Sequence, residues 1–451
     1  MKSAMNPQDV HATIKKYMLG DGEALVLDLA KSHGAYIHDA LSGRDFIDFF
    51  TFYGSQPVGY NHPKMQDDAF KEALLEAAQI KPSSSDFYTT HMARFVETFG
   101  RVAMPEGFHH LFLISGGALA VENALKTAFD WKVRKNFKRI QDNPDAAQKM
   151  YIEGFGTQII HFKEAFHGRS GYTLSLTNTD DPRKYMYFPK FNWPRIETPK
   201  LRFPVTDDVL AQVTRIEDIA LAQIESAVRQ FRGDVAALII EPIQGEGGDN
   251  HFRDEFFQAL RDMANKHEFL FIVDEVQSGM GITGKMWAME HTPVMPDLIA
   301  FGKKAQVCGV IAGPRLKEVK NHVFEESSRI NSTWGGNLVD MVRSTRYLEI
   351  IEEEKLLQHA ARVGQKMIDG LEQIAEESKG VMTNVRGKGF MIAYDLPSRE
   401  VRNDVLHKLS DHGLKALKSG PHSVRFRGML DTPEDVVDKA LEIVAQTVPV
   451  G

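Results

Sequence analysis

The chain has 451 residues, of which 43% are hydrophobic and 25% charged, and its formal net charge is −7. This length suits two or three domains, and the composition is that of an ordinary globular protein. The negative net charge argues against non-specific nucleic-acid binding, which requires a basic face.

No apolar run approaches the roughly 20 residues that are needed to cross a bilayer. The first residues, "MKSAMNPQDVHATIKKYML", also lack the uninterrupted apolar stretch of a signal peptide. We therefore expect no membrane association, and the cytoplasm is the expected compartment. The single cysteine, Cys308, excludes an intramolecular disulfide and fits a reducing compartment.

In chain order, residues 1–60 are expected to form a short helix and then strands, because "GAYIHDALSGRDFIDFF" alternates apolar and polar residues around a Ser-Gly turn. Over residues 61–340, amphipathic helical stretches alternate with the short apolar runs "HLFLIS", "TQIIHF", "AALIIEPI", "FLFIVDEV" and "DLIAFGK". This alternation predicts an α/β domain whose mainly parallel sheet is covered by helices on both faces. Residues 341–451 predict two long helices, then strands and a mixed α+β tail. We expect a large domain over 61–340 and a smaller α+β domain built from both chain ends.

Charged and polar residues follow two of these apolar runs. Asp274, Glu275 and Gln277 end "FLFIVDEVQSG", and Lys303 and Lys304 end "DLIAFGKK". Ligands of open α/β sheets bind beyond the carboxyl ends of the strands. A carboxylate buried there needs a positive or donating partner, so Asp274 is either a structural cap or ion-pair partner, or it faces a ligand. Lys303 is likewise either an ion-pair partner or an amine that forms a Schiff base, with a pKa lowered by burial.

A glycine pair precedes a helix in "LFLISGGALAVENALKTAF", which places Gly117 and Ala118 at a strand-to-helix junction. Backbone N–H groups at a helix N-terminus bind phosphate. A Schiff-base lysine, a carboxylate for a ring nitrogen and a phosphate site are together what pyridoxal 5′-phosphate (PLP) requires. Any tight turn can use a glycine pair, so the combination of features carries this prediction.

The motifs "IVDEVQSGMGITG", "PDLIAFGKK" and "STWGGN" together resemble the class III (ω-) aminotransferases, which are PLP enzymes of fold type I. The resemblance covers nearly the whole chain. Further stretches, among them "KPSSSDFYTTHMARFVETF", "AFHGRSGYTLSLTNT" and "FGKKAQVCGV", are similar to the members that act on the terminal amine of lysine. The resemblance implies PLP-dependent, ping-pong transfer of the ε-amino group of L-lysine to 2-oxoglutarate. The products would be 2-aminoadipate 6-semialdehyde and L-glutamate.

The resemblance also implies roles in cofactor binding. Lys303 would bond to the cofactor and then act as the general base, with the adjacent Lys304 as the alternative. Asp274 would pair with the pyridinium nitrogen, and Gln277 would hydrogen-bond the phenolic oxygen. Glu275 would support these residues without contacting the cofactor itself.

Gly117 and Ala118 would donate backbone N–H groups to the phosphate, and Phe166 would stack on the pyridine ring. Thr333 of "NSTWGG" would reach the phosphate in the neighbouring subunit, which implies a homodimer with shared active sites. Taken alone, an aromatic residue in the place of Phe166 is more often part of the core than a cover for a cofactor. The alternative for Thr333 is a simple turn hydroxyl.

Two arginines would let one site accept two substrates, because guanidinium groups bind carboxylates bidentately. The resemblance implies that Arg169 binds the carboxylate distant from the reacting amine, and that Arg425 binds the α-carboxylate of glutamate. Glu246 would neutralise Arg425 while lysine is bound. The alternative is an ordinary strand arginine and a loop-capping glutamate. The family usually continues with Pro-Pro-Leu after this arginine, where the chain has Gly428-Met429-Leu430.

Other functions compete with this hypothesis. Another ω-aminotransferase would take ornithine, acetylornithine or 4-aminobutyrate, and a PLP racemase, aminomutase or decarboxylase would need no oxoacid. A non-catalytic protein that has kept the fold would not take up PLP. No phosphate-binding G-x-x-x-x-G-K-[ST] motif occurs, and the histidines lack H-x-x-x-H spacing, so we expect no metal.

Overall fold

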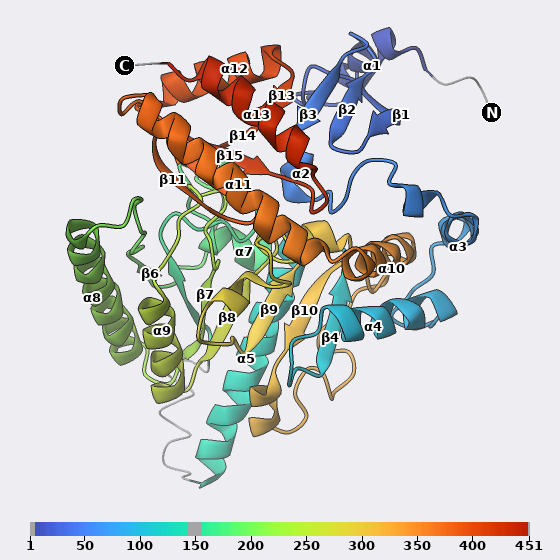
Figure 1. Cartoon of the computed structure of the whole chain (residues 1–451). Coiled ribbons are helices and arrows are strands. Elements are labelled where there is room, and N and C mark those ends of the chain that lie inside the picture. The colour runs from blue at the N-terminus through green and yellow to red at the C-terminus, as the bar shows by residue number, and fades with distance from the viewer. Residues whose placement is uncertain (1–4, 143–155, 450–451) are drawn as a thin grey trace.

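The computed structural model describes residues 5–142 and 156–449. The chain begins with η1 (Pro7–Asp9) and α1 (Val10–Lys15), followed by strands β1 (Leu27–His33), β2 (Tyr36–Asp39) and β3 (Asp45–Asp48). These strands pair in antiparallel order, and β3 also pairs in parallel with β13 (Leu414–Lys415) near the other chain end. Segments from both ends of the chain therefore share one sheet, and both ends lie on the same side of the molecule (Figure 1).

The central sheet has seven strands. Its order is β4 (His110–Ile114), β10 (Cys308–Ala312), β9 (Leu298–Phe301), β8 (Leu270–Asp274), β7 (Val235–Ile240), β5 (Gln158–Phe162) and β6 (Arg195–Ile196). Only β10 runs antiparallel to its neighbours, so the prediction of a mainly parallel sheet is confirmed. Every residue of β7, β8 and β9 is buried.

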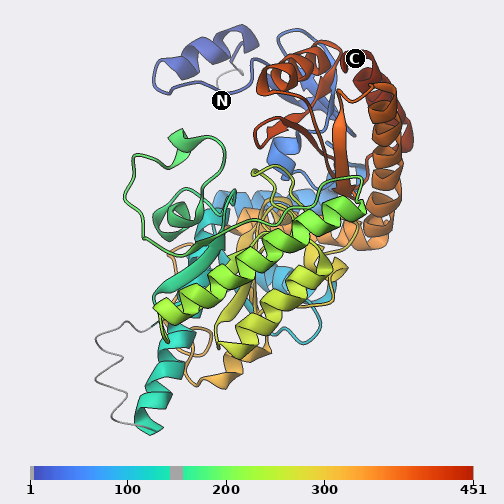
Figure 2. The same cartoon turned by 90° about the vertical axis from the view of Figure 1, so that its left-hand side faces the viewer.

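Helices cover both faces of this sheet, as the continuous apolar runs predict. Alternate residues of β8 point to opposite faces of the sheet. Leu270 and Ile272 belong to the hydrophobic cluster that includes α5 (Gly117–Asp142). Phe271 and Val273 pack instead in the cluster of α8 (Asp207–Gln230) and α9 (Asp254–Lys266). Figure 2 shows α8 and α9 side by side across the sheet. No described helix combines the length and apolarity that a membrane crossing requires.

The C-terminal part contains an antiparallel sheet in the order β11 (Thr383–Lys388), β12 (Met391–Asp395), β15 (Ser423–Arg427) and β14 (Leu417–Ser419). Its helices are α11 (Leu356–Glu377), α12 (Arg399–Asp411) and α13 (Glu434–Thr447). The two expected long helices are α10 (Leu338–Glu353) and α11, which separate at Lys355, a residue with φ +53°. Because α10 packs against α3 (Asp68–Gln79) and α4 (Thr90–Val102), the expected boundary at residue 340 falls inside a helix of the large domain.

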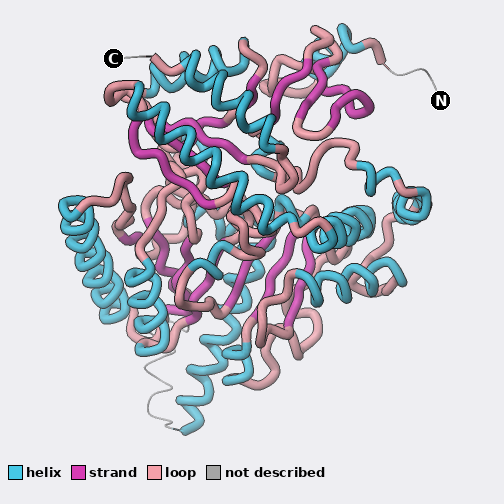
Figure 3. Tube along the Cα trace, in the orientation of Figure 1, coloured by secondary structure: helices cyan, strands magenta, loops and turns pink. Residues whose placement is uncertain are grey.

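Short helices and loops connect these elements (Figure 3). The short helices are α2 (Thr51–Gly54), η2 (Pro63–Gln66), α7 (Gly171–Leu176), η3 (Pro182–Lys184), η4 (Ala288–His291), η5 (Lys303–Ala305) and η6 (Pro314–Glu318).

Candidate active site

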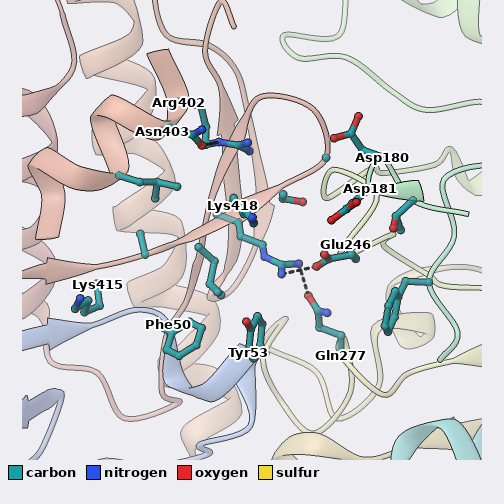
Figure 4. Close-up of a pocket in the computed structure, with 18 of the residues that line it drawn as sticks. Phe50, Tyr53, Asp180, Asp181, Glu246, Gln277, Arg402, Asn403, Lys415 and Lys418 are labelled. Carbon is teal, nitrogen blue, oxygen red and sulfur yellow. Dashed lines mark hydrogen bonds and ion pairs between the residues drawn. The ribbon is translucent and has the colours of Figure 1, made fainter. Parts of the chain in front are cut away.

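A cavity of about 910 Å³ lies between the carboxyl ends of the central strands and the C-terminal sheet. Segments that follow β5, β7, β8 and β9 meet α12, β14 and β15 around it. Figure 4 shows Glu246 and Gln277 pointing into this pocket, with Asp180 and Asp181 along one side. Six predicted site residues line it: Phe166, Arg169, Glu246, Gln277, Lys303 and Arg425.

Two consecutive lysines follow β9 and point in different directions. Lys303 has φ +48°, lines the cavity and donates from Nζ to the Tyr53 carbonyl at 2.9 Å. Lys304 is only 2% exposed, and its Nζ donates to the carbonyls of Gln56 at 2.8 Å and Gly428 at 3.1 Å. Of these two lysines, only Lys303 therefore presents its amine to the cavity.

Asp274 is the last residue of β8 and is 5% exposed. Its Oδ2 lies 2.8 Å from Nδ1 of the buried His167, and its Oδ1 accepts from the Val276 backbone N–H at 3.0 Å. No arginine or lysine pairs with it among the described residues. Asp274 lies beside Ala300 of β9, three residues before Lys303, so the carboxylate and the amine belong to neighbouring strand ends.

The N-terminus of α5 meets the same strand ends. A Cβ added to Gly117 would lie 3.0 Å from Cγ1 of Val276, and one added to Gly302 would lie 3.4 Å from that methyl group. Val276 thus packs between the start of α5 and the residue before Lys303. The N–H of Ala120 bonds to the Gly116 carbonyl, while the N–H groups of the preceding helical residues have no partner within the helix. This is the geometry of a small anion site.

Gln277 contacts two arginines that extend from β15. Its Oε1 accepts from Nη1 of Arg425 at 3.2 Å and from Nη2 of Arg427 at 2.8 Å. Because the amide oxygen is occupied in this way, its NH₂ group is the part left to donate to a ligand.

Glu246 and Arg425 form the ion pair that the sequence predicts, with 2.8 Å between Oε2 and Nη2. Arg425 is 1% exposed, and its Nε has no hydrogen-bond partner among the described residues. Arg169 lies on the cavity wall with an exposed side chain that forms no ion pair in the described part of the chain. One guanidinium is thus open to an anion, and the other is closed by a carboxylate.

The sequence matches the family described as Aminotransferase class-III over residues 18–448. The chain belongs to the class III aminotransferases. It is 48% identical over 440 residues to the L-lysine-epsilon aminotransferase of Amycolatopsis lactamdurans, with 97% of this chain and 95% of that protein covered. The L-lysine-epsilon aminotransferase of Mycobacterium tuberculosis is 46% identical over 445 residues, with coverage of 98% and 96%.

A solved structure of the lysine aminotransferase from M. tuberculosis in the internal aldimine form has a TM-score of 0.94 to this chain. The two are 45% identical, and 99% of this chain and 100% of that chain are covered. The predicted α/β architecture of fold type I is confirmed by this likeness.

PLP is the cofactor of the class III aminotransferases, and the residues present fit it. The amine of Lys303 faces the cavity, while Asp274 offers a buried carboxylate that pairs with His167 and with no lysine or arginine of the described chain. The backbone N–H groups of the half-buried Gly117 and Ala118 would hold the phosphate. When bound, PLP supplies an aldehyde carbon and a ring that accepts electrons.

Of three further predicted residues, one lines the cavity and two do not. Phe166 lines the cavity, and its backbone N–H donates to Oε1 of the buried Glu241 at 2.9 Å, which fixes the loop that carries it. Thr333 is exposed on a loop and does not line the cavity of its own chain. Glu275 points away from the cavity and accepts from the backbone N–H groups of Ala288 and Met289, at the start of η4.

Sequence reasoning missed two contributions to this class III site. His167 contacts Asp274, but in the sequence it is one of 17 histidines and has no distinguishing pattern. Arg427 is fully buried and forms an ion pair with the fully buried Asp249, 178 positions earlier in the chain. A signal for Arg427 existed, since "SVRFR" places it on the same strand face as Arg425.

The departure from the family's Pro-Pro element has a structural reason. A Cβ at Gly428 would lie 2.7 Å from Cδ1 of Phe390, so a proline ring does not fit there without movement. The Gly428 carbonyl accepts instead from Lys304. This bond anchors the backbone just after β15.

Uptake of PLP by the apoprotein should depend on pH through Lys303. Burial, with Arg425 and Arg427 nearby, lowers the pKa of Lys303 to about 7. Only the neutral amine attacks an aldehyde, so the rate at which visible absorbance appears should rise about tenfold per pH unit below pH 7 and level off above it. A rate that still rises steeply at pH 9 would indicate an ordinary lysine with a pKa of about 10.4.

Proposed function

We propose that this class III aminotransferase transfers the ε-amino group of L-lysine to 2-oxoglutarate, giving 2-aminoadipate 6-semialdehyde and L-glutamate. The observation that carries the proposal is 46–48% identity over nearly the full length to proteins named L-lysine-epsilon aminotransferase. The cavity supports it, because Arg169 is open to an anion and Arg425 is paired with Glu246.

Lys303 transfers the proton, and Asp274 supplies the negative charge that stabilises the cofactor ring. Asp274 places a negative charge where the ring nitrogen binds, and His167 fixes the orientation of its carboxylate. Lys303 Nζ, whose pKa is lowered to about 7, would move the proton that leaves the ε-carbon of bound lysine once PLP supplies a ring that accepts electrons. Two half-reactions of this kind give ping-pong kinetics.

Arg169, Arg425 and Glu246 select the two substrates. Arg169 binds the α-carboxylate of lysine or the γ-carboxylate of 2-oxoglutarate. While lysine is bound, Glu246 keeps Arg425 paired, so the apolar stem of lysine does not face a free charge. The α-carboxylate of 2-oxoglutarate replaces Glu246 on Arg425.

The active unit is a homodimer in this proposal. The chain exposes large apolar side chains around the loop of Thr333: Leu75 (61%), Ile80 (73%), Phe87 (72%), Tyr88 (80%) and Trp334 (41%). This loop packs on the segment after α3, where Ser84 N–H donates to the Trp334 carbonyl. A second copy would cover this surface and bring Thr333 to its phosphate, so light scattering should give twice the 50.8 kDa chain mass.

A panel of amine donors tests the reaction. With 2-oxoglutarate as acceptor, kcat/KM for L-lysine should exceed that for L-ornithine, one methylene shorter, by roughly 10- to 200-fold. Acetylornithine and 4-aminobutyrate should also be poorer donors. An equal or higher value for ornithine would place the chain among the other ω-aminotransferases. Lysine consumption without an oxoacid would indicate a racemase, aminomutase or decarboxylase.

A further inference from the structure

The carboxylate of Glu246 is bound from two sides. Besides the Arg425 contact on Oε2, its Oε1 lies 2.5 Å from Nζ of Lys184, which also lines the cavity. Lys184 ends η3, in the segment between α7 and β6, whereas Arg425 belongs to β15 of the C-terminal sheet. Glu246 therefore bridges cations from two separate parts of the molecule.

The segment around η3 is built so that Lys184 is the cation available to Glu246. Asp181 caps this short helix and pairs with the neighbouring Arg183, with 2.8 Å between Oδ1 and Nε. Asp180 pairs with Arg399 at 2.6 Å. The two acids closest in sequence are thus occupied, and the only carboxylate paired with Lys184 in the described structure is that of Glu246.

The net charge of the cluster formed by Lys184, Glu246, Arg425, Arg427 and Asp249 determines how favourably a substrate carboxylate binds there. Two cations, Lys184 and Arg425, share the single carboxylate of Glu246, while the next arginine is neutralised by Asp249. One positive charge in the cluster is therefore unmatched. A substrate α-carboxylate would make the cluster neutral, whereas without Lys184 the same carboxylate would leave one negative charge in a largely buried site.

We propose that Lys184 is a specificity-determining residue, which holds Glu246 when a substrate α-carboxylate takes its place on Arg425. The carboxylate can turn on Lys184 and keep one ion pair, so its release from Arg425 does not leave it unpaired. Burial would raise the pKa of Glu246, but Arg425 and Lys184 hold it below the usual value, so the carboxylate is charged while it is paired with both cations. The inference rests on the proposed function, since it gives Arg425 the α-carboxylate.

Binding of unreactive acids to the holoenzyme tests this without turnover. Glutarate carries both carboxylates of 2-oxoglutarate, and butyrate carries one. Calorimetry should show that Lys184→Met weakens glutarate about tenfold but butyrate less than about twofold, and that Lys184→Arg restores glutarate binding. Lys190→Met is the matched control, because Lys190 lies on the same segment and, among the described residues, forms hydrogen bonds to the carbonyls of Tyr185 and Phe188 and no ion pair.

Steady-state kinetics should likewise separate substrates that carry an α-carboxylate at Arg425 from those that do not. Lys184→Met should raise KM for 2-oxoglutarate about tenfold, with KM for lysine and for succinate semialdehyde, an acceptor without an α-carboxylate, changed less than about twofold. Unchanged glutarate binding, or equal weakening of glutarate and butyrate, would overturn the proposal. If wild-type enzyme prefers another amine, the lysine assignment fails, while the comparison of glutarate with butyrate still decides the role of Lys184.

Discussion

Replacing Lys303 with alanine is expected to lower kcat by roughly 10⁴-fold and to remove the visible absorbance of the lysine–cofactor bond. Lys303 is the lysine that reaches the cavity from the end of β9, next to the strand end that carries Asp274, so it is the amine placed to bond the aldehyde and move the proton. Absorbance spectra during addition of lysine, and then of 2-oxoglutarate, would measure both losses together.

Lys304→Met is the matched comparison, since it removes the neighbouring amine. It leaves the carbonyls of Gln56 and Gly428 without their buried donor, so we expect a loss of about 1–3 kcal/mol in the free energy of unfolding. The absorbance band should remain. If Lys303→Ala kept the band and turnover while Lys304→Met lost both, the two lysines would have to exchange roles.

Asp274→Asn is expected to lower kcat by roughly 10³-fold while PLP still binds. The amide has nearly the shape of the carboxylate, but it cannot hold a proton on the ring nitrogen by charge, so the ring becomes a weaker electron acceptor. The half-reaction with lysine, followed by stopped-flow absorbance, isolates this step from substrate exchange.

Asp297→Asn is the control for this substitution. Asp297 is also a buried carboxylate, but it precedes β9 at the opposite end of the strand and pairs with Arg261 and Arg315. Its loss should lower thermal stability and leave kcat within a few-fold. Similar losses of kcat in both variants would mean that removing any buried carboxylate lowers kcat and that Asp274 has no specific role in the reaction.

Much of the fold could be predicted because apolar runs bounded by polar strand ends encode a covered parallel sheet. β8 and β9 were predicted from such runs, and their ends placed Asp274 and Lys303 together. β10 was missed, since it follows β9 after a tight turn instead of a crossover helix and runs antiparallel to it. A pattern of helices between strands does not signal such a strand.

Contacts between distant segments account for most of what the sequence could not show. The different directions of the two lysines depend on the turn after Gly302, where strand alternation ends. The pair of Arg427 with Asp249 and that of Lys184 with Glu246 join residues whose partners no local pattern identifies. The site predicted for Thr333 depends on a second chain, which no single-chain pattern describes.

The two hydrogen bonds from Lys304 Nζ connect the position of the reactive lysine to the packing of distant segments. The ammonium group of Lys304 joins a segment that follows α2 to the residue just after β15, while its backbone neighbour carries the reactive amine. A substitution that displaces the backbone at either carbonyl would therefore also shift the turn that orients Lys303.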